Sequence, residues 1–293
     1  MRSSAELGIV ILVAFAVCGG GQQPRTISVG PGESIARAIA GAKPGDRVTL
    51  SRGVYSESTI VIDRPLTLTG EPGAVIDGSR ATHILRIEAD DVTVRGLSFR
   101  NVATSHVEDR AAIRAGEVRN CVIEDNRIDD AFFGIYLAGT SACRVARNVL
   151  RARRATEDSS GNGIHLWTAR DVDVVGNRIE GHRDGIYLEF VHDSRVVGNT
   201  SSGNVRYGLH FMYSDNCRYE RNAFTANGAG VAVMYTKGVR MSDNRFEGSW
   251  GPAAYGLLLK EVYDAALERN VFTANTTALV ADGASRLFAR ANV

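Results

Sequence analysis

Two thioether side chains and one imidazole stand at related positions in the middle of the chain. His210 and Met212 lie two residues apart in RYGLHFMYSDN, and Met234 occupies the corresponding place in the next similar stretch, GVAVMY. Side chains two residues apart point to the same face of a β-strand. Thioether sulfur and imidazole nitrogen suit Cu(I), whereas Ca²⁺ and Mg²⁺ prefer oxygen ligands. The three residues therefore predict either a soft-metal transfer site or an adaptable apolar patch that docks a partner.

The composition is that of a globular chain without an extreme charge. The 293 residues are 44% hydrophobic and 23% charged, and 34 Lys and Arg nearly balance 33 Asp and Glu. Such a balance does not favour a nucleic-acid partner. No phosphate-binding loop of the ATPase type occurs in the sequence, so we expect any coupling to ATP to come from another chain.

The first 23 residues have the layout of a secretory signal peptide. Arg2 precedes an apolar run from Leu7 to Val17, and small residues follow it. That run is too short to span a bilayer. We therefore predict an exported, periplasmic protein that does not itself span the membrane and whose signal peptide is cleaved.

A repeat with a base period of 22 residues organises the rest of the chain. Its first landmark is an Asn followed by an apolar residue, found at Asn126, Asn148, Asn177, Asn199, Asn222, Asn244, Asn270 and Asn292. Its second landmark is a Gly followed by a short β-rich run, found at Gly134, Gly163, Gly185, Gly208, Gly230 and Gly256. Short β-rich runs at this period predict an all-β fold, a right-handed parallel β-helix in which each repeat is one coil.

Equivalent residues of successive coils must then form columns, about 4.8 Å apart. The Asn column predicts a structural ladder in which side-chain amides bond from coil to coil. Cys121, Cys143 and Cys217 each lie five residues before an Asn of this series. Because side chains of one column point the same way, we expect these cysteines to be small core residues with free thiols rather than a disulfide.

The strand after each Gly landmark alternates between aliphatic and mixed positions. Ile135, Leu137 and their equivalents are uniformly aliphatic and predict the core face. The positions between them predict an outer face, on which Met234 stacks on Met212 one coil further on. His165 and Glu189 fall in the same outer columns and are candidate auxiliary ligands.

The two ends of the repeat region differ. Residues 24–80 are expected to hold an N-terminal cap and the first coils, with an amphipathic helix from about Glu33 to Ala42 covering the open end of the stack. Residues 81–293 form the repeats. The last residues, LFARANV, still lie inside a repeat, which indicates further coils beyond Val293. Two coils are longer, at 29 and 26 residues, and place RARRATEDSSG and EGSWGPA in rim loops.

An enzyme is the alternative from a different class. Parallel β-helices include polysaccharide lyases, hydrolases and epimerases. These chemistries need carboxylates and a base on one outer face, and the local candidates are Asp184, Glu189, His192 and Arg183.

The stretches RDGIYLEFVHDSRVVGN, RYGLHFMYSDN, GVAVMY and YGLLLKE resemble the periplasmic NosD family of nitrous oxide reductase maturation, from about Gly30 to the end of the chain. The resemblance implies a non-enzymatic scaffold that takes part in copper delivery during denitrification. Its implied partners are an ABC transporter permease and ATPase, a copper-chaperone lipoprotein and apo nitrous oxide reductase. It implies copper as the bound metal, held transiently as Cu(I), for which His210, Met212 and Met234 are the candidate ligands. That family continues well past residue 293.

Overall fold

A computed structural model describes residues 23–80, 82–105, 107–153 and 156–293. The signal peptide predicted at residues 1–23 lies outside the described residues except for Gln23.

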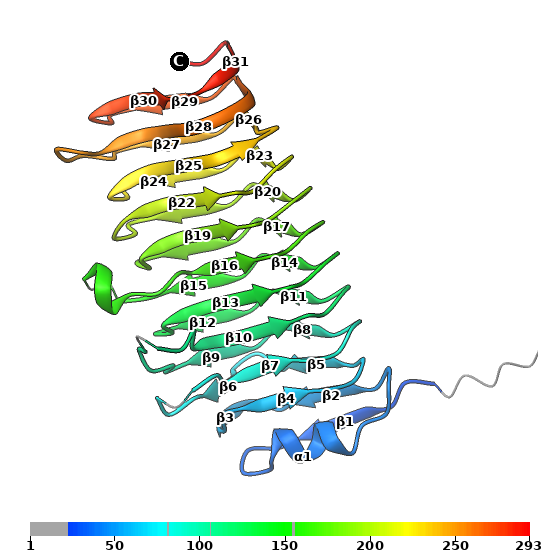
Figure 1. Ribbon diagram of the computed structural model, residues 1–293. Helices are drawn as coiled ribbons and strands as arrows, with labels where there is room; N and C mark the ends of the chain where they lie inside the picture. The colour runs from blue at the N-terminus through cyan, green and yellow to red at the C-terminus, as the bar shows by residue number, and fades with distance from the viewer. Residues whose placement is uncertain (1–22, 81, 106, 154–155) are drawn as a thin grey trace, which may run out of the picture.

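The described chain winds into a right-handed parallel β-helix, which confirms the predicted fold (Figure 1). Each full coil contributes three short strands, and every strand pairs in parallel with its equivalents in the coils before and after. The strands form a 21-stranded sheet and a 10-stranded sheet. The larger sheet comprises two faces of the helix, because the long strand β28 (Tyr255–Glu268) turns the corner between them.

The three faces are named here by their strands. Face 1 consists of β4 (Ile60–Ile62), β7 (Leu85–Ile87), β10 (Ala111–Gly116), β13 (Phe133–Ala138), β16 (Ile164–Trp167), β19 (Asp184–Glu189), β22 (Tyr207–Met212), β25 (Ala229–Lys237), the first half of β28 and β30 (Thr277–Asp282). Face 2 consists of β1 (Thr26–Val29), β2 (Arg47–Leu50), β5 (Thr67–Gly70), β8 (Thr93–Arg95), β11 (Val122–Glu124), β14 (Arg144–Ala146), β17 (Asp173–Val175), β20 (Arg195–Val197), β23 (Arg218–Glu220), β26 (Arg240–Ser242), the second half of β28 and β31 (Ser285–Arg290). Face 3 consists of β3 (Gly53–Ser56), β6 (Ala74–Asp77), β9 (Ser98–Arg100), β12 (Arg127–Asp129), β15 (Val149–Arg151), β18 (Arg178–Glu180), β21 (Thr200–Ser202), β24 (Ala223–Thr225), β27 (Arg245–Glu247) and β29 (Val271–Thr273).

The core runs along the axis of the helix as one continuous apolar cluster. The two aliphatic columns of face 1 point into it, as the alternation predicted. Their members from Ile135 and Leu137 to Leu257 and Leu259 are fully buried. Since every coil buries the same positions, each coil covers the apolar side chains of its neighbours.

The glycine at the start of each face 1 run is required by close packing between coils. A Cβ placed on Gly163 would lie 2.6 Å from the carbonyl oxygen of Gly185, and one on Gly208 would lie 2.9 Å from that of Gly230. Both distances are shorter than a carbon–oxygen contact allows. The second sequence landmark therefore marks a column of backbone contacts without room for side chains.

A short helix covers the N-terminal end of the stack, below β1 and β2 in Figure 1. The helix, α1 (Ile35–Ala40), is shorter than the predicted Glu33–Ala42, and Ile35 and Ile39 bury its apolar face. Its N-terminus is capped by Ser34 and by Glu57, whose carboxylate accepts hydrogen bonds from the amides of Ile35 and Ala36.

The Asn column forms the predicted ladder. Asn148 donates through its backbone N–H and its Nδ2 to the side-chain oxygen of Asn177, at 2.9 and 3.0 Å, and Asn177 does the same to Asn199. Each Nδ2 also donates to a backbone carbonyl of a neighbouring coil, such as that of Val145 for Asn177. The pattern continues from Asn126 to Asn292, so these buried amides satisfy one another along the turn between faces 2 and 3.

The prediction of free thiols was wrong for two of the three cysteines. Cys121 and Cys143 form a disulfide between neighbouring coils, with their Cα atoms 4.6 Å apart. This separation is within the usual range for a disulfide, so residues stacked in one column can be linked in spite of their common direction. Cys217 is a buried free thiol, as expected.

The Asn ladder makes the first testable prediction. Asn177→Ala removes the acceptor of two buried donors of Asn148, and each unsatisfied buried donor costs about 1–3 kcal/mol. We expect urea denaturation to show a loss of about 2–6 kcal/mol in the free energy of unfolding. Thr93→Ala, at a half-buried outward position on β8, is the control and should cost clearly less. Equal losses for the two variants would contradict a ladder that derives its strength from buried hydrogen bonds.

Candidate metal site on the outer face

The structure confirms the register that the site requires. On face 1, Met212 of β22 is the direct partner of Met234 of β25, and His210 lies two residues before Met212 on the same strand. Glu189 of β19 precedes Met212 in this column, and Lys260 of β28 follows Met234. The two thioethers therefore lie on neighbouring coils and on the same outer face.

The candidate ligands on the outer side of face 1 are more buried than side chains on an open surface. Met212 and Met234 are half-buried, but His210 is only 6% exposed. The rings of Tyr187 and Tyr207 each lie with their centroids 4.9 Å from that of His210. Large side chains stacked at the strand spacing cover one another, so an outward direction does not guarantee contact with solvent.

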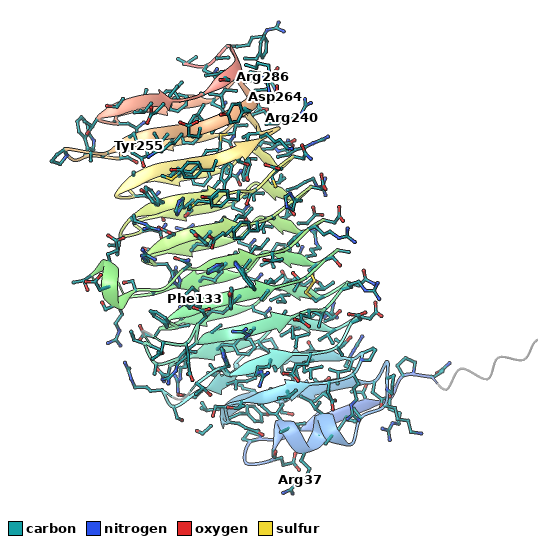
Figure 2. All side chains as sticks on the ribbon, viewed as in Figure 1. Arg37, Phe133, Arg240, Tyr255, Asp264 and Arg286 are labelled. Atoms are coloured by element: carbon teal, nitrogen blue, oxygen red, sulfur yellow. A yellow bond between two sulfur atoms is a disulfide. The ribbon has the colours of Figure 1, made fainter. Side chains whose placement is uncertain are left out.

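A row of aromatic rings accounts for this burial. It runs along face 1 through Phe133, Tyr136, His165, Tyr187 and His210, with successive centroid distances of 5.7, 4.6, 4.7 and 4.9 Å. Figure 2 shows Phe133 on β13 and Tyr255 on β28 over the same face. Phe133 and Tyr136 belong to a small apolar cluster that is separate from the main core. The outer face is thus a second packed layer.

The two ring nitrogens of His210 have different surroundings. Nδ1 lies 3.2 Å from Nη2 of Arg206 and 3.5 Å from Oδ2 of Asp184. Nε2 is buried and has no hydrogen-bond partner. A buried imidazole nitrogen without a partner is available to a metal ion, and a carboxylate beside the other nitrogen is the usual arrangement around a ligating histidine.

Asp184 anchors this arrangement from a fully buried position. Arg206 makes two hydrogen bonds to its carboxylate, Nε to Oδ1 at 3.0 Å and Nη2 to Oδ2 at 2.6 Å. Burial acts to raise the pKa of Asp184, but its close contacts with His210 and Arg206 outweigh burial and lower the pKa below its ordinary value. Asp184 is therefore an ionised carboxylate held against a guanidinium.

Met212 accepts a hydrogen bond from a neighbouring tyrosine. The hydroxyl of Tyr187 donates to the sulfur of Met212 at 3.9 Å. Burial, together with the nearby Glu189 carboxylate, raises the pKa of Tyr187, so this hydroxyl keeps its proton at neutral pH. Thioether sulfur remains a ligand at any pH, so Met212 and Met234 keep their donor character under acidic conditions.

The two candidate auxiliary ligands are placed differently. Glu189 is the register partner of Met212 and lies beside the thioether pair. His165 is the register partner of Tyr187 and is separated from His210 by the Tyr187 ring. Burial lowers the pKa of His165 to about 3, so its imidazole is neutral, but it does not share a site with His210.

The residues considered for an enzyme do not come together. Asp184 is buried in its pair with Arg206, His192 is exposed in an isolated β-bridge with Arg170, and Arg183 pairs with Glu157. Within the described residues, no group of three His, Cys, Asp or Glu side chains is placed to hold a metal ion.

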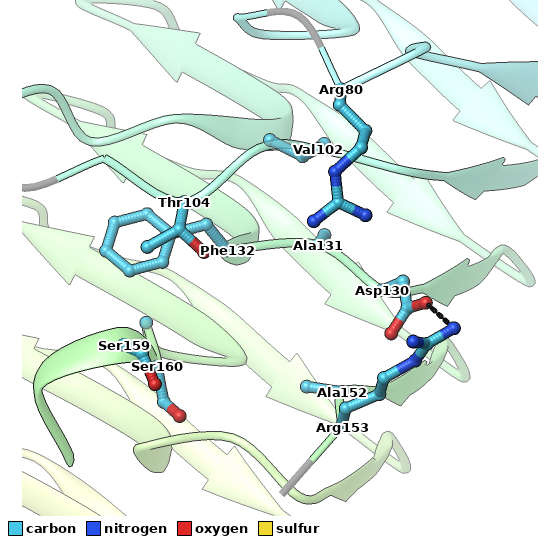
Figure 3. Close-up of a pocket in the computed structure, with 11 residues that line it drawn as sticks. Arg80, Val102, Thr104, Asp130, Ala131, Phe132, Ala152, Arg153, Ser159 and Ser160 are labelled. Atoms are coloured by element: carbon cyan, nitrogen blue, oxygen red, sulfur yellow. Dashed lines mark ion pairs between the residues drawn. The ribbon is translucent and has the colours of Figure 1, made fainter. Parts of the chain in front are cut away.

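A separate hollow of about 190 Å³ lies near the turns between faces 3 and 1 (Figure 3). Asp130 and Arg153 form an ion pair there at 3.0 Å, and Arg80 points toward the same space. Its lining lacks histidine, cysteine and methionine. It therefore offers neither a soft-metal site nor a pair of free carboxylates.

Three residues that shape this face were not predicted as part of the metal site. Arg206 pairs with Asp184 of the preceding coil although the register partner of Asp184 is Tyr207, so the repeat period does not specify this pairing. His182, just before β19, is fully buried, in a column that continues with Asn204.

Comparisons with known proteins match the part of the chain that contains His210, Met212 and Met234. Residues 148–292 match the family model described as "Periplasmic copper-binding protein (NosD)". The "Probable ABC transporter binding protein NosD" of Pseudomonas aeruginosa is 36% identical over 141 residues, which cover 47% of this chain and 33% of that protein. The chain belongs to the NosD family. A second NosD relative, from Stutzerimonas stutzeri, is 28% identical over 187 residues, 63% of this chain and 40% of the relative. The chain thus matches well under half the length of either NosD relative.

Solved structures share the fold of this NosD family member at low identity. The A-module of the mannuronan C-5 epimerase AlgE4 of Azotobacter vinelandii is 14% identical with a TM-score of 0.61, covering 89% of this chain and 96% of that one. A family 28 exopolygalacturonase of Yersinia enterocolitica has 10% identity and a TM-score of 0.65, covering 92% and 76%. PfbA, a surface adhesin of Streptococcus pneumoniae, has 10% identity and a TM-score of 0.64, covering 88% and 85%. Two enzymes and an adhesin share the architecture, so the fold alone does not decide function.

Helices are few in this NosD family member. Within residues 23–80, 82–105, 107–153 and 156–293, none has the length and apolar character that a bilayer span requires.

The burial of His182 makes a pH prediction. Burial lowers its pKa from 6.5 to about 4, so between these values the unfolded chain binds a proton that the folded chain does not. Stability is therefore lost as the pH falls below 6.5, by about 2 kcal/mol at pH 5 for this residue. His182→Asn places at this position the residue that the next coil has at Asn204. Urea unfolding at pH 7.5 and pH 5.0 gives the free energy of unfolding at each pH. The loss between pH 7.5 and pH 5.0 should be about 2 kcal/mol smaller in the variant than in the wild type. An unchanged difference would contradict the prediction.

Proposed function

We propose that this chain is a periplasmic scaffold that receives Cu(I) on the outer surface of face 1 and presents it to a client protein. The client in this proposal is apo nitrous oxide reductase. Two findings support the proposal: the family model describes periplasmic copper-binding proteins, and two methionines and a histidine lie on one face in the matched segment.

The observation that carries the proposal is the pairing of Met212 with Met234 beside an unpartnered imidazole nitrogen. Met212 and Met234 are in register on adjacent strands, and Nε2 of His210 is buried without a partner. Two thioethers and one imidazole form a ligand set that is suited to Cu(I) and poorly suited to hard cations. The residues present therefore fit the metal.

Half-burial of the two methionines fits transfer better than storage. Closed four-ligand sites hold structural metal ions, whereas a site that keeps an open position can exchange its ligands. Here a client can approach Met212 and Met234 from solvent, while His210 holds the ion from the protein side. Glu189 beside the thioethers adds a negative charge that favours a cation.

In this proposal, partner proteins supply the copper and the ATP hydrolysis. We propose that copper arrives from a copper-chaperone lipoprotein and that the scaffold works with the permease and ATPase of an ABC transporter. Both relatives are named as probable ABC transporter binding proteins, which supports the transporter part of this proposal. The sequence has no phosphate-binding loop, so ATP hydrolysis is assigned to the partner.

Anaerobic titration of Cu(I) against a chromogenic competing chelator tests the site. Met212→Leu/Met234→Leu keeps the apolar volume of both side chains and removes both sulfur atoms. We expect the affinity for Cu(I) to fall at least about tenfold, which corresponds to about 1.4 kcal/mol of binding free energy.

Met241→Leu is the matched control, because Met241 is buried in the core and its sulfur does not face the site. It should leave the Cu(I) affinity unchanged. Equal affinity in the wild type, the double variant and the control would exclude the methionine pair and leave the face without an assigned metal site.

A further inference from the structure

We propose that Arg206 and Asp184 compete for Nδ1 of His210 and thereby determine whether Nε2 can bind copper. The inference rests on the copper site proposed above and assigns its regulation. Arg206 stabilises the His210 tautomer that cannot bind copper, and Asp184 stabilises the tautomer that can.

The three side chains form a closed triangle of polar contacts. Nη2 of Arg206 lies 2.6 Å from Oδ2 of Asp184 and 3.2 Å from Nδ1 of His210. Nδ1 of His210 lies 3.5 Å from the same Oδ2. All three groups are more than two-thirds buried, and water therefore screens these contacts little.

A neutral imidazole carries one N–H, so Nδ1 can serve only one of these neighbours. With the proton on Nε2, Nδ1 accepts a hydrogen bond from Arg206, and Nε2 has no lone pair to offer a metal. With the proton on Nδ1, it donates to Asp184, and the lone pair of Nε2 is free. We call the tautomer with Nε2–H the closed form, because its Nε2 cannot bind a metal, and the tautomer with Nδ1–H the open form, because its Nε2 can.

The metal-free geometry favours the closed form. The contact between Arg206 and Nδ1 is short enough for a hydrogen bond, whereas the 3.5 Å between Nδ1 and Oδ2 exceeds the usual N–H···O distance. The closed form has a cost, because it leaves the buried Nε2–H without an acceptor. Copper binding at Nε2 moves one proton from Nε2 to Nδ1, leaves the imidazole neutral and removes this unsatisfied donor.

Arg206 has further partners that do not depend on Nη2, the nitrogen in contact with His210. Its Nε donates to Oδ1 of Asp184 at 3.0 Å, and its Nη1 donates to Oε1 of Glu157 at 3.2 Å. Its guanidinium also lies 4.8 Å from the centroid of the Tyr207 ring. When copper binds, Nη2 gives up Nδ1, and these contacts continue to hold the guanidinium. Glu157 belongs to η1 (Glu157–Ser159) in the 29-residue coil between Asn148 and Asn177, so this rim loop holds the competing group.

Substitutions of the two groups should have opposite effects on copper affinity. Arg206→Met keeps the apolar length of the side chain and removes the competing donor, and we expect it to bind Cu(I) about tenfold more tightly. Asp184→Asn keeps the shape but removes the carboxylate that accepts from Nδ1–H, and we expect binding about tenfold weaker. Anaerobic competition titration measures both. A purely structural ion pair would weaken binding in both variants, and that result would overturn the inference.

The tautomer itself can be measured without any variant. In protein labelled with ¹⁵N-histidine, two-dimensional ¹H–¹⁵N correlation of the ring nuclei distinguishes Nε2–H from Nδ1–H. We expect His210 to carry the proton on Nε2 in the metal-free protein and on Nδ1 after addition of Cu(I). A proton on Nδ1 before copper is added would overturn the inference even if a variant fails to fold.

The experiments separate this inference from the proposed function. If Met212→Leu/Met234→Leu weakens binding while Arg206→Met and Asp184→Asn change it in the same direction, the copper site stands and the competition does not. If the wild type binds no Cu(I), both fail. Thermal unfolding followed by circular dichroism establishes that each variant used in the titration is folded.

Discussion

Parallel, in-register hydrogen bonding between coils is the constraint on which the rest of this structure depends. Because each strand meets its equivalent about 4.8 Å away, whatever residue type occupies a position must tolerate a similar residue directly above and below it. Asn satisfies this condition with its own kind, since each amide offers both a donor and an acceptor along the column. Glycine satisfies it where two backbones touch. Aliphatic side chains satisfy it in the core.

The same constraint shaped what the sequence was able to predict. The period of 22 residues, the Asn ladder and the aliphatic columns follow from types and spacing alone, because the column fixes the neighbours of every residue. The register of Met212 with Met234 follows for the same reason. These features require no knowledge of side-chain conformations.

Other features depend on where side chains turn once they leave the backbone, and the sequence did not predict them. His210 points outward but is buried, because the rings of Tyr187 and Tyr207 lie over it. Asp184 and Arg206 find each other across one coil, and this pairing needs side-chain directions that a period does not specify. The disulfide was misjudged because two side chains that point the same way were assumed to stay apart.

An epimerase module, an exopolygalacturonase and an adhesin share this architecture, so the fold itself does not determine what each protein does. Function must therefore lie in the outer columns. The bond between Cys121 and Cys143 gives that architecture a further property. It joins residues 22 apart in sequence, so it closes a covalent ring around one complete turn of the solenoid. A repeat protein can lose order coil by coil from its ends. Loss of order that spreads from either end therefore reaches a turn that stays covalently closed and cannot be drawn out into an extended chain.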